Sequence, residues 1–473
     1  MAEIASPVAV PLWLIAALAV LSAIAIIDRV LLPLVRIARQ RRADRRIEEL
    51  NTRLRLRIQS FKLTERRILI DRLVSDPDVL AAAEAHAAAT GIPVAKAVDK
   101  ARRYAREIVP SFSAYTYFRV GARLARRLSQ VLYRVRLGYA NDEALRAVDP
   151  DAAVVFVINH RSNMDYVLVT YMVSRSSALS YAVGEWAQVW LLRDLIRSMG
   201  AYFIRRNSGD PLYRKVLSRY VAMATYAGVV QAVFPEGGLS RDGALRPPKV
   251  GLISYMVQSF DPAGARDIVF VPVGVNYDRV LEDRNLTAAL ALAPGEEPRF
   301  RFNPLIFVAY LAKSVWRLVT GRLYRNGYAC VSFGAPVSLR TYLAERRLDF
   351  RVLDPDTRKV AIDALAADLM QRVGSVIPAL PVALVATALT ERPNQVLTEF
   401  ELKGRVAALM TALEDRGAYV HVPRQDRAYA VDVGLRMLEL RGLVVRRDGG
   451  IAVCTGEEVL LAYYANSIRH LVG

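Results

Sequence analysis

A histidine and an aspartate five positions apart, His160 and Asp165, have the residue types and spacing for proton transfer. A histidine that removes a proton needs a carboxylate on its other ring nitrogen, which fixes the tautomer and stabilises the imidazolium. The spacing allows this pairing within one loop. Taken alone, the pair describes a structural histidine beside a helix-capping aspartate more often than a catalytic pair. Three later segments favour the catalytic interpretation.

The surrounding pattern predicts the elements that position the pair. An apolar, β-branched run ends just before His160, and a second apolar run starts at Tyr166, which predicts a buried strand, a polar turn and a helix. From about 138 to 340, short apolar runs typical of strands alternate with helical stretches, which predicts an α/β sheet covered by helices. Strands are expected at 153–158, 179–183, 229–234, 268–275 and 328–333, and helices at 165–174, 186–198, 211–227 and 247–259.

Ligands of such sheets bind at the carboxyl ends of the strands, where His160, Glu236 and Pro272 fall. One further segment, GAYFIRR, ends in the adjacent arginines Arg205 and Arg206. Two neighbouring guanidiniums suit a phosphate, whose oxygens they bind in bidentate fashion. A solvated basic turn explains these residues equally well.

A glycine-rich segment, FPEGGLSRDG, follows the third predicted strand. Gly237 lets backbone N–H groups approach an anion, and Ser240 and Arg241 supply further donors. Glu236 is predicted to orient an arginine or a substrate hydroxyl, and Lys249, expected on the next helix, adds a point charge. A last segment, VPVGVNYDRV, is a strand with a polar end and by itself is structural.

The chain has 473 residues and a net charge of +19, from 65 Lys and Arg against 46 Asp and Glu. This excess indicates a polyanionic partner: nucleic acid, an anionic membrane surface or a phosphorylated substrate. The two cysteines, Cys330 and Cys454, form neither a disulfide framework nor a CxxC metal pair, which fits a reducing compartment. The four scattered histidines offer no metal-ligand cluster, so no metal or other cofactor is expected.

Val8 to Ile27 is free of charge and long enough to span one bilayer core. A cleaved signal peptide fits less well, because Met1 to Pro7 carries only Glu3. The arginines that follow indicate a cytoplasmic flank. We expect a single-pass anchor in the inner (plasma) membrane, with the remaining chain in the cytosol.

Two other segments suit the membrane surface. Residues 36–72 predict a basic amphipathic helix that binds anionic headgroups, with a solvated helix as the alternative. Residues 304–325 predict either an interfacial helix or a packed one. The C-terminal part is mainly helical, with a buried apolar stretch at 376–389 and a hairpin around Asp448-Gly449-Gly450. Its candidate recognition helix has few basic residues, so no nucleic acid is expected as a partner.

Taken together, these segments resemble the four ordered blocks of the glycerolipid acyltransferase superfamily. Their residues are most similar to those of its glycerol-3-phosphate 1-O-acyltransferases. INHRSNMD resembles the first block, GAYFIRRNSGDPLYRKVLSRYV the second, FPEGGLSRDG the third and VPVGVNYDRVLE the fourth. FGAPVSLRTYLAE and LLAYYANSIRHL also resemble the glycerol-3-phosphate branch. The similarity runs from about residue 110 to the C-terminus.

The resemblance implies that His160 is the general base and Asp165 its orienting partner. It also implies sites for the two substrates. Arg206, with Arg205, would bind the glycerol phosphate; Glu236, Gly237, Ser240 and Arg241 would shape the acceptor site, with Lys249 nearby, and Pro272 the acyl-donor region. One departure is Leu239, which stands where these enzymes usually carry an arginine. A remaining cation must compensate for it, or the acceptor differs.

The predicted function is membrane-bound transfer of a fatty acyl group from acyl-CoA or acyl-carrier protein to the sn-1 hydroxyl of glycerol 3-phosphate, forming lysophosphatidate for phospholipid synthesis. Lysophosphatidate or dihydroxyacetone phosphate is the alternative acceptor, and a catalytically silent membrane-bound scaffold is the alternative of another class. The expected organisation is an anchor (1–35), a basic helical region (36–135), an α/β acyltransferase domain (136–345) and a helical C-terminal domain (346–473).

Overall fold

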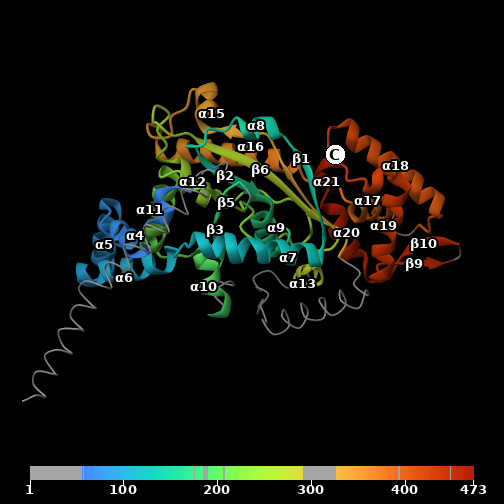
Figure 1. Ribbon diagram of the computed structural model, residues 1–473, viewed down its shortest axis with the longest axis horizontal. Coiled ribbons are helices and arrows are strands. Elements are labelled where there is room, and N and C mark those ends of the chain that lie inside the picture. The colour runs from blue at the N-terminus through green and yellow to red at the C-terminus, as the bar shows by residue number, and fades with distance from the viewer. Residues whose placement is uncertain are drawn as a thin grey trace, which may run out of the picture. The chain divides into compact units, whose positions relative to one another are not determined.

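Figure 1 shows the computed structural model of the protein. Among the residues that it describes, eight strands form the central sheet. Its strand order is β1-β7-β6-β2-β5-β3-β4, with β8 paired to β6. Strands β6, β2, β5, β3 and β4 run parallel, whereas β7 and β8 run antiparallel to β6. The predicted α/β class is therefore confirmed. The strands are β1 Arg134–Ala140, β2 Ala153–Ile158, β3 Ser180–Gly184, β4 Tyr202–Ile204, β5 Gln231–Val233, β6 Ile268–Tyr277, β7 Tyr328–Phe333 and β8 Val337–Ser338.

The structure describes residues 56, 58–174, 176–184, 190–205, 208–290, 326–392, 395–447 and 449–473. The predicted anchor, residues 36–55 of the predicted basic helix, the segment 304–325 and Arg206 lie outside the described residues. Within them, no helix is both long enough and apolar enough to cross a membrane.

Three of the predicted strands, β2, β6 and β7, are confirmed nearly to the residue. Strand β3 is displaced by one position, and β5 is present but only half as long as predicted. Strand β1 was not predicted, because its exposed and half-buried residues do not form an apolar run. It lies at the sheet edge and pairs in parallel with β7. An edge strand needs few buried side chains, so its sequence resembles the preceding helix more than a core strand.

Helices connect the strands and flank the sheet. Several begin at an aspartate whose carboxylate accepts backbone N–H groups, followed by a proline that cannot donate: Asp210-Pro211 and Asp354-Pro355. The N-terminal and central helices are α3 Ser60–Leu63, α4 Arg66–Val74, α5 Pro77–Thr90, α6 Val94–Ile108, the π-helix η2 Thr116–Gly121, α7 Ala122–Leu132, α8 Asp142–Arg146, α9 Met164–Val173, α10 Trp190–Ser198, α11 Pro211–Tyr226, α12 Gly251–Val257 and α13 Asp283–Ala288. The C-terminal helices are α15 Leu339–Arg346, α16 Pro355–Ser375, α17 Pro381–Thr390, α18 Glu399–Asp415, α19 Arg427–Leu440, α20 Glu458–Asn466 and α21 Arg469–Val472.

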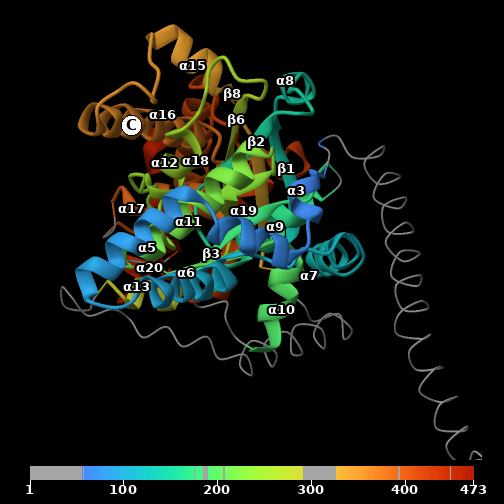
Figure 2. The same cartoon turned by 90° about the vertical axis from the view of Figure 1, so that its left-hand side faces the viewer.

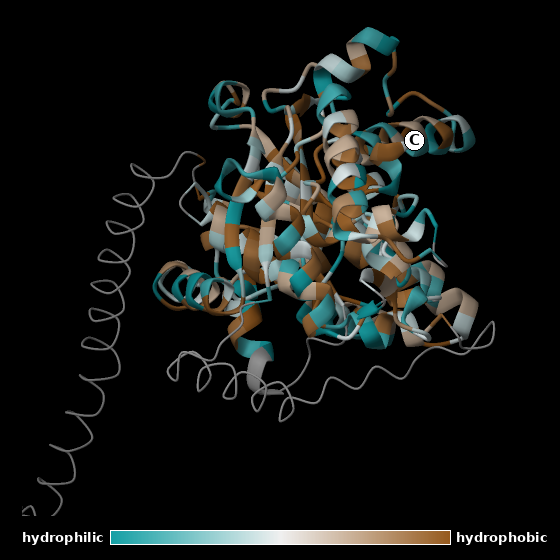
Figure 3. Cartoon of the chain, turned by 90° about the vertical axis from the view of Figure 1, so that its right-hand side faces the viewer, coloured by the Kyte–Doolittle hydropathy of each residue, from teal (hydrophilic) through white to brown (hydrophobic). Residues whose placement is uncertain are grey.

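The sheet separates two hydrophobic cores, because successive side chains of a strand point to opposite faces. In β2, Val154 and Phe156 belong to one core and Val155 and Val157 to the other. The first core is completed by α7, α9 and the C-terminal helices α17 to α20. The second is completed by α4, α5, α6, α11, α12, α15 and α16, and Figure 2 shows α5, α6 and α11 side by side. Hydrophobic residues gather inside these layers and hydrophilic ones on outward helix sides (Figure 3).

The C-terminal region packs directly on the sheet domain. The apolar stretch predicted to be buried forms α17, which is buried along nearly its whole length. The predicted hairpin is present as β9 Val444–Arg447 and β10 Gly450–Val453. Residues 56–473 form one compact unit, so the packing itself marks no boundary at 135 or at 345.

Candidate active site

His160 and Asp165 form the predicted pair. The Nδ1 atom of His160 lies 2.9 Å from Oδ2 of Asp165, and the two side chains are 2% and 0% exposed. The histidine follows the carboxyl end of β2, and the aspartate lies in the first turn of α9. A carboxylate can only accept, so the neutral ring carries its proton on Nδ1 and has its lone pair on Nε2.

The Asp165 carboxylate is stabilised by three further donors. Its Oδ2 atom accepts the backbone N–H groups of Arg161 and Ser162 at 2.7 and 3.0 Å, and its Oδ1 atom accepts the phenol of Tyr277 at 2.7 Å. A buried carboxylate needs such donors to remain charged. These bonds fold residues 159–165 into a tight turn, here called the His160 turn.

The imidazole of His160 is held between aromatic rings. Its ring centroid lies 4.3 Å from that of Phe234 and 5.4 Å from that of Tyr166, the latter edge to face. Its Nε2 atom makes no hydrogen bond with the described residues. The ring is therefore fixed in position while its basic nitrogen is left for an incoming hydroxyl.

Glu236 holds the backbone of the histidine rather than an arginine side chain or an open site. Its Oε1 atom accepts the N–H of His160 at 2.7 Å, and its Oε2 atom accepts the N–H of Arg246 at 3.2 Å. Burial raises the pKa of this carboxyl to about 7, although the two backbone donors oppose the shift. Glu236 thus joins the His160 turn to the loop after β5.

The glycine-rich segment forms that loop. Gly237 has φ +69, and a Cβ there would meet the Lys249 side chain at 2.6 Å, so the lysine stem passes over this glycine. Ser240 is fully buried: its N–H donates to the carbonyl of His160, and its Oγ lies 2.8 Å from the carbonyl of Ala244. Ser240 therefore shapes the loop from within, while half-buried Arg241 makes no hydrogen bond or ion pair with the described residues.

Lys249 lies in this loop and not on a helix. The helix predicted from residue 247 begins only at Gly251, because Pro247 and Pro248 disfavour a helical conformation before them and supply no N–H donor. The Lys249 backbone N–H donates to the carbonyl of Pro235 at 2.7 Å, and its side chain is exposed. Its ammonium group is thus available beside Gly237.

Arg205 is at the same level of the sheet as His160. The parallel registers align Val157 with Val233 and Ala182 with Tyr202, so extending each strand by three residues brings His160, Glu236 and Arg205 into line. The Arg205 guanidinium, however, is bound by Glu107 through two bonds of 2.9 and 2.7 Å. That carboxylate raises its pKa, so the predicted phosphate ligand already has an anionic partner.

Pro272 lies inside β6, opposite Val157 of β2, and is buried. Its carbonyl accepts the N–H of Gly334 at 2.8 Å, at the change from β7 to β8. A role in binding the acyl donor stays a prediction. The polar end of the same strand contributes Tyr277, whose hydroxyl reaches Asp165 as described above.

Sequence reasoning missed three side chains that hold the His160 turn. They are Tyr277, Glu282 and Arg161. Glu282 accepts hydrogen bonds from the Ser162 hydroxyl and from the backbone and side chain of Asn163. Tyr277 and Glu282 lie in the segment VPVGVNYDRVLE, and their place at the polar end of the predicted strand and just beyond it was the available signal.

Arg161 points away from the His160 ring toward the C-terminal helices. Its guanidinium is 3% exposed, bonds the carbonyl of Gly243 and lies 4.8 Å from the ring centroid of Tyr463 in α20. Its Nε and Nη2 atoms have no partner among the described residues. The arginine contributes a positive charge behind the turn.

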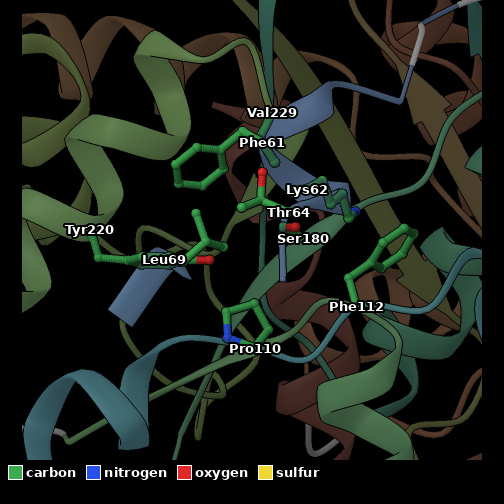
Figure 4. Close-up of a pocket in the computed structure, with 9 residues that line it drawn as sticks. All are labelled: Phe61, Lys62, Thr64, Leu69, Pro110, Phe112, Ser180, Tyr220 and Val229. Carbon is green, nitrogen blue, oxygen red and sulfur yellow. The ribbon is translucent and has the colours of Figure 1, made fainter. Parts of the chain in front are cut away.

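A small pocket lies at the amino ends of the strands, whereas His160 lies at their carboxyl ends. The pocket is beside Ser180 at the start of β3 and Val229 before β5 (Figure 4). Its one charged lining residue, Lys62, is 8% exposed, donates to the carbonyl of Ala178 at 2.7 Å and lies 4.4 Å from the Phe112 ring centroid. Burial lowers the pKa of this lysine. The pocket is remote from His160 along the strands, so it is not part of the candidate active site.

No group of three or more His, Cys, Asp or Glu side chains that could bind a metal ion occurs in the part of the chain that the structure describes. The site as built consists of a base, its carboxylate and nearby cations. Two serines lie near His160, but the Ser162 hydroxyl donates to Glu282 and the Ser240 hydroxyl to the carbonyl of Ala244. Neither hydroxyl is bonded to the imidazole, so the arrangement suits direct attack by a substrate hydroxyl.

The comparisons with known proteins agree with this chemistry. Residues 137–276 match the family model described as acyltransferase, which covers β2 to β6 and the His160 turn. In the matched segment and in its site, the chain is thus similar to the acyltransferases of the His-x4-Asp glycerolipid superfamily. Residues 313–472 match a second model, described as the glycerol-3-phosphate acyltransferase C-terminal region. The resemblance to the glycerol-3-phosphate branch of that superfamily is thereby confirmed.

The curated relatives that the chain resembles are named glycerol-3-phosphate acyltransferase. The chain is 27% identical over 440 residues to a glycerol-3-phosphate acyltransferase of Xylella fastidiosa (strain M23), a match that covers 89% of this chain and 48% of the relative. The corresponding enzyme of Aeromonas hydrophila is 28% identical over 420 residues, covering 87% and 50%. The chain therefore spans about half the length of the curated relatives it matches.

Among solved structures, the chain is similar to a 1-acyl-sn-glycerophosphate acyltransferase from Thermotoga maritima. The identity is 17%, the TM-score is 0.28, and the match covers 53% of this chain and 80% of the other.

Proposed function

We propose that this protein transfers a fatty acyl group from an acyl thioester to the sn-1 hydroxyl of glycerol 3-phosphate, forming lysophosphatidate. The observation that carries the proposal is the buried 2.9 Å contact between Nδ1 of His160 and Asp165, with no hydrogen bond from the described residues to Nε2. The match of residues 313–472 to the glycerol-3-phosphate acyltransferase C-terminal region supports this acceptor over lysophosphatidate or dihydroxyacetone phosphate.

In the proposed reaction, Nε2 of His160 removes the proton of the sn-1 hydroxyl as its oxygen attacks the thioester carbonyl. The tetrahedral intermediate then collapses, the carbon–sulfur bond breaks, and the thiolate takes the proton back from the imidazolium. Asp165 stabilises the imidazolium between the two steps. General-base help of this kind is typically worth about 10² to 10⁴ in rate.

The phosphate of the acceptor needs cations near His160. Arg241 and Lys249 are the candidates, since both belong to the loop that Glu236 connects to the histidine and neither pairs with a carboxylate of the described residues. The resemblance adds Arg206, which lies outside the described residues. Arg205 would act after release from Glu107 or by holding this edge of the site. Because Leu239 stands where the resemblance expects an arginine, these cations would supply the phosphate contact that this arginine makes in the similar enzymes.

The donor is proposed to be acyl-CoA or acyl-carrier protein, without a metal or other cofactor. A panel of acceptors with one radiolabelled acyl thioester tests the proposal on the purified protein. Labelled lysophosphatidate should form with glycerol 3-phosphate and should be lost in His160→Ala. Labelling of lysophosphatidate to phosphatidate instead would favour the alternative acceptor, and no transfer to any acceptor would favour the scaffold.

We also propose an inner-membrane location with the catalytic part in the cytosol, because the product is an amphiphile that leaves into the bilayer. Support comes from the charge-free segment Val8 to Ile27 and its arginine-rich flank. Fractionation tests it: an anchored protein stays with membranes at high salt and is released by detergent, whereas release by salt alone would show surface binding.

A further inference from the structure

Two consecutive acidic residues at the start of α13 bind two different parts of the molecule. The first, Glu282, is buried and holds the His160 turn. Its Oε2 atom accepts the Ser162 hydroxyl at 2.7 Å, and its Oε1 atom accepts the backbone N–H and the side-chain amide of Asn163 at 3.2 and 3.1 Å. Burial raises the pKa of Glu282, and the Ser162 and Asn163 donors oppose that shift.

The second residue, Asp283, holds the C-terminal helices. Its Oδ2 atom lies 2.5 Å from a guanidinium nitrogen of Arg441, just after α19, and also bonds the hydroxyl of Tyr464 in α20. Asp283 and Arg441 are 5% and 8% exposed. The Tyr464 hydroxyl further accepts the N–H of Val280 at 3.2 Å and a bond from Arg441 at 2.7 Å. The carboxylate of Asp283, the guanidinium of Arg441 and the phenol of Tyr464 are thus all bonded to one another.

Because Glu282 and Asp283 are adjacent, any displacement of the C-terminal helices moves the carboxylate that holds the His160 turn. Side chains one residue apart on a rigid, buried backbone cannot move independently by the distances that break hydrogen bonds. The contacts of α13 with α20 make the same connection through packing. The two acids therefore connect the His160 turn to the C-terminal helices, and Glu282 and Asp283 together are here called the clamp.

We infer that Glu282 is a positioning residue for the acyl-transfer reaction and that the Arg441–Asp283–Tyr464 cluster sets its position, so that the C-terminal helices determine the geometry of the His160 turn. The inference rests on the proposed function for its catalytic consequence. Its structural part, the dependence of the turn on the cluster, is independent of any activity.

The test compares three variants of the full chain. Glu282→Gln weakens the end that holds the turn. Asp283→Asn combined with Arg441→Met removes both charges of the other end, so that neither is left buried alone. Arg284→Ala is the matched control, because this neighbour in α13 makes only an exposed ion pair with Glu457. Tyr464→Phe serves in place of the double variant if that protein does not fold.

The first readout is hydrogen exchange of the backbone amides of residues 161–163, which Asp165 and Glu282 bind. Exchange should rise by about 10-fold or more in Glu282→Gln and in the double variant, and remain at the wild-type rate in Arg284→Ala. Faster exchange in Glu282→Gln alone would overturn the inference, because the turn would then not depend on the C-terminal cluster.

The second readout is steady-state kinetics with glycerol 3-phosphate. We expect kcat to fall by about 10²-fold in both variants, as for a small misplacement of a reacting group, with KM nearly unchanged. The variant combining all three substitutions should be no slower than the slower of its parents, because both ends act on the same turn. Multiplied effects would contradict the single clamp. If the wild type transfers no acyl group while the exchange pattern holds, the proposed function fails and the clamp stands.

Discussion

The phenol of Tyr277 donates a hydrogen bond of 2.7 Å to Oδ1 of Asp165, although the two residues are 112 positions apart. Burial of Tyr277 and the neighbouring Asp165 charge raise the pKa of the phenol well above its usual value, so it remains a donor at all working pH values. Strand β6 thus stabilises the carboxylate that orients His160. This contact leads to the first prediction.

Tyr277→Phe should lower kcat by about 10-fold, because a hydrogen bond to a charged group contributes about 1.5–3 kcal/mol. The ring stays in place, so KM for both substrates should change little. Steady-state kinetics with glycerol 3-phosphate check the prediction, with Tyr133→Phe, another buried tyrosine beside Tyr277, as the control. An unchanged kcat would mean that Asp165 does not need this donor.

His160→Ala and Asp165→Asn should each reduce turnover by about 10² to 10⁴, because the first removes the base and the second its charged partner. Both proteins should melt as cooperatively as the wild type, which circular dichroism checks. Substantial residual activity in His160→Ala would remove the proposed mechanism.

Arg241→Ala should raise KM for glycerol 3-phosphate by about 10-fold or more, since one charge-assisted hydrogen bond to phosphate is lost. Arg206→Ala should do the same. Arg205→Ala should have a smaller effect, because Glu107 already binds that guanidinium. If only the KM of the acyl donor changes in Arg241→Ala, the arginine belongs to the other substrate.

The stability of the protein should depend on pH through Glu236. Its pKa is raised from 4.5 to about 7 in the folded state, so the folded protein binds the proton more tightly than the unfolded chain. The contribution of Glu236 to stability is therefore full below about pH 4.5 and is lost as pH rises to about 7, by at most about 3 kcal/mol. Urea unfolding of wild type and Glu236→Gln between pH 5 and pH 8, at about unit steps, measures the difference. A difference that does not change with pH would contradict the prediction.

Close helix packing supplies a last prediction. A Cβ on Gly434 of α19 would lie 2.4 Å from the Pro381 carbonyl at the start of α17, a backbone atom that cannot move aside. Gly434→Ala should therefore destabilise the protein by about 1–3 kcal/mol despite the better helix propensity of alanine. Gly404→Ala in α18, where no atom lies within 4 Å of the new Cβ, should be neutral or stabilising. Thermal melting distinguishes the two.

The sequence predicted those parts of the fold that local chemistry determines. The apolar runs of β2 and β6 identify core strands, and the polar residues at their ends identify the site. Strand β1 was not predicted because an edge strand carries exposed residues. Helix α12 begins later than predicted because of two prolines. The pairing of His160 with Asp165 could be predicted because only five positions separate the two residues.

Long-range partners could not be predicted. Arg205 lies 98 positions from Glu107, and Ser162 lies 120 positions from Glu282; no local pattern relates either pair. Glu236 was expected to face a side chain or substrate, but its partners are backbone N–H groups whose direction depends on the parallel register of β2 and β5. Only the assembled sheet brings these atoms together.

The hydrophobic core shared by the sheet and helices α17 to α20 limits how the protein can be divided for experiments. A recombinant fragment that stops near residue 345 would leave Val273, Val275 and Val331 facing water where α17 and its neighbours had covered them. Such a fragment is expected to aggregate during purification, so enzymology on this protein requires the sheet domain and the C-terminal helices to be produced as one polypeptide.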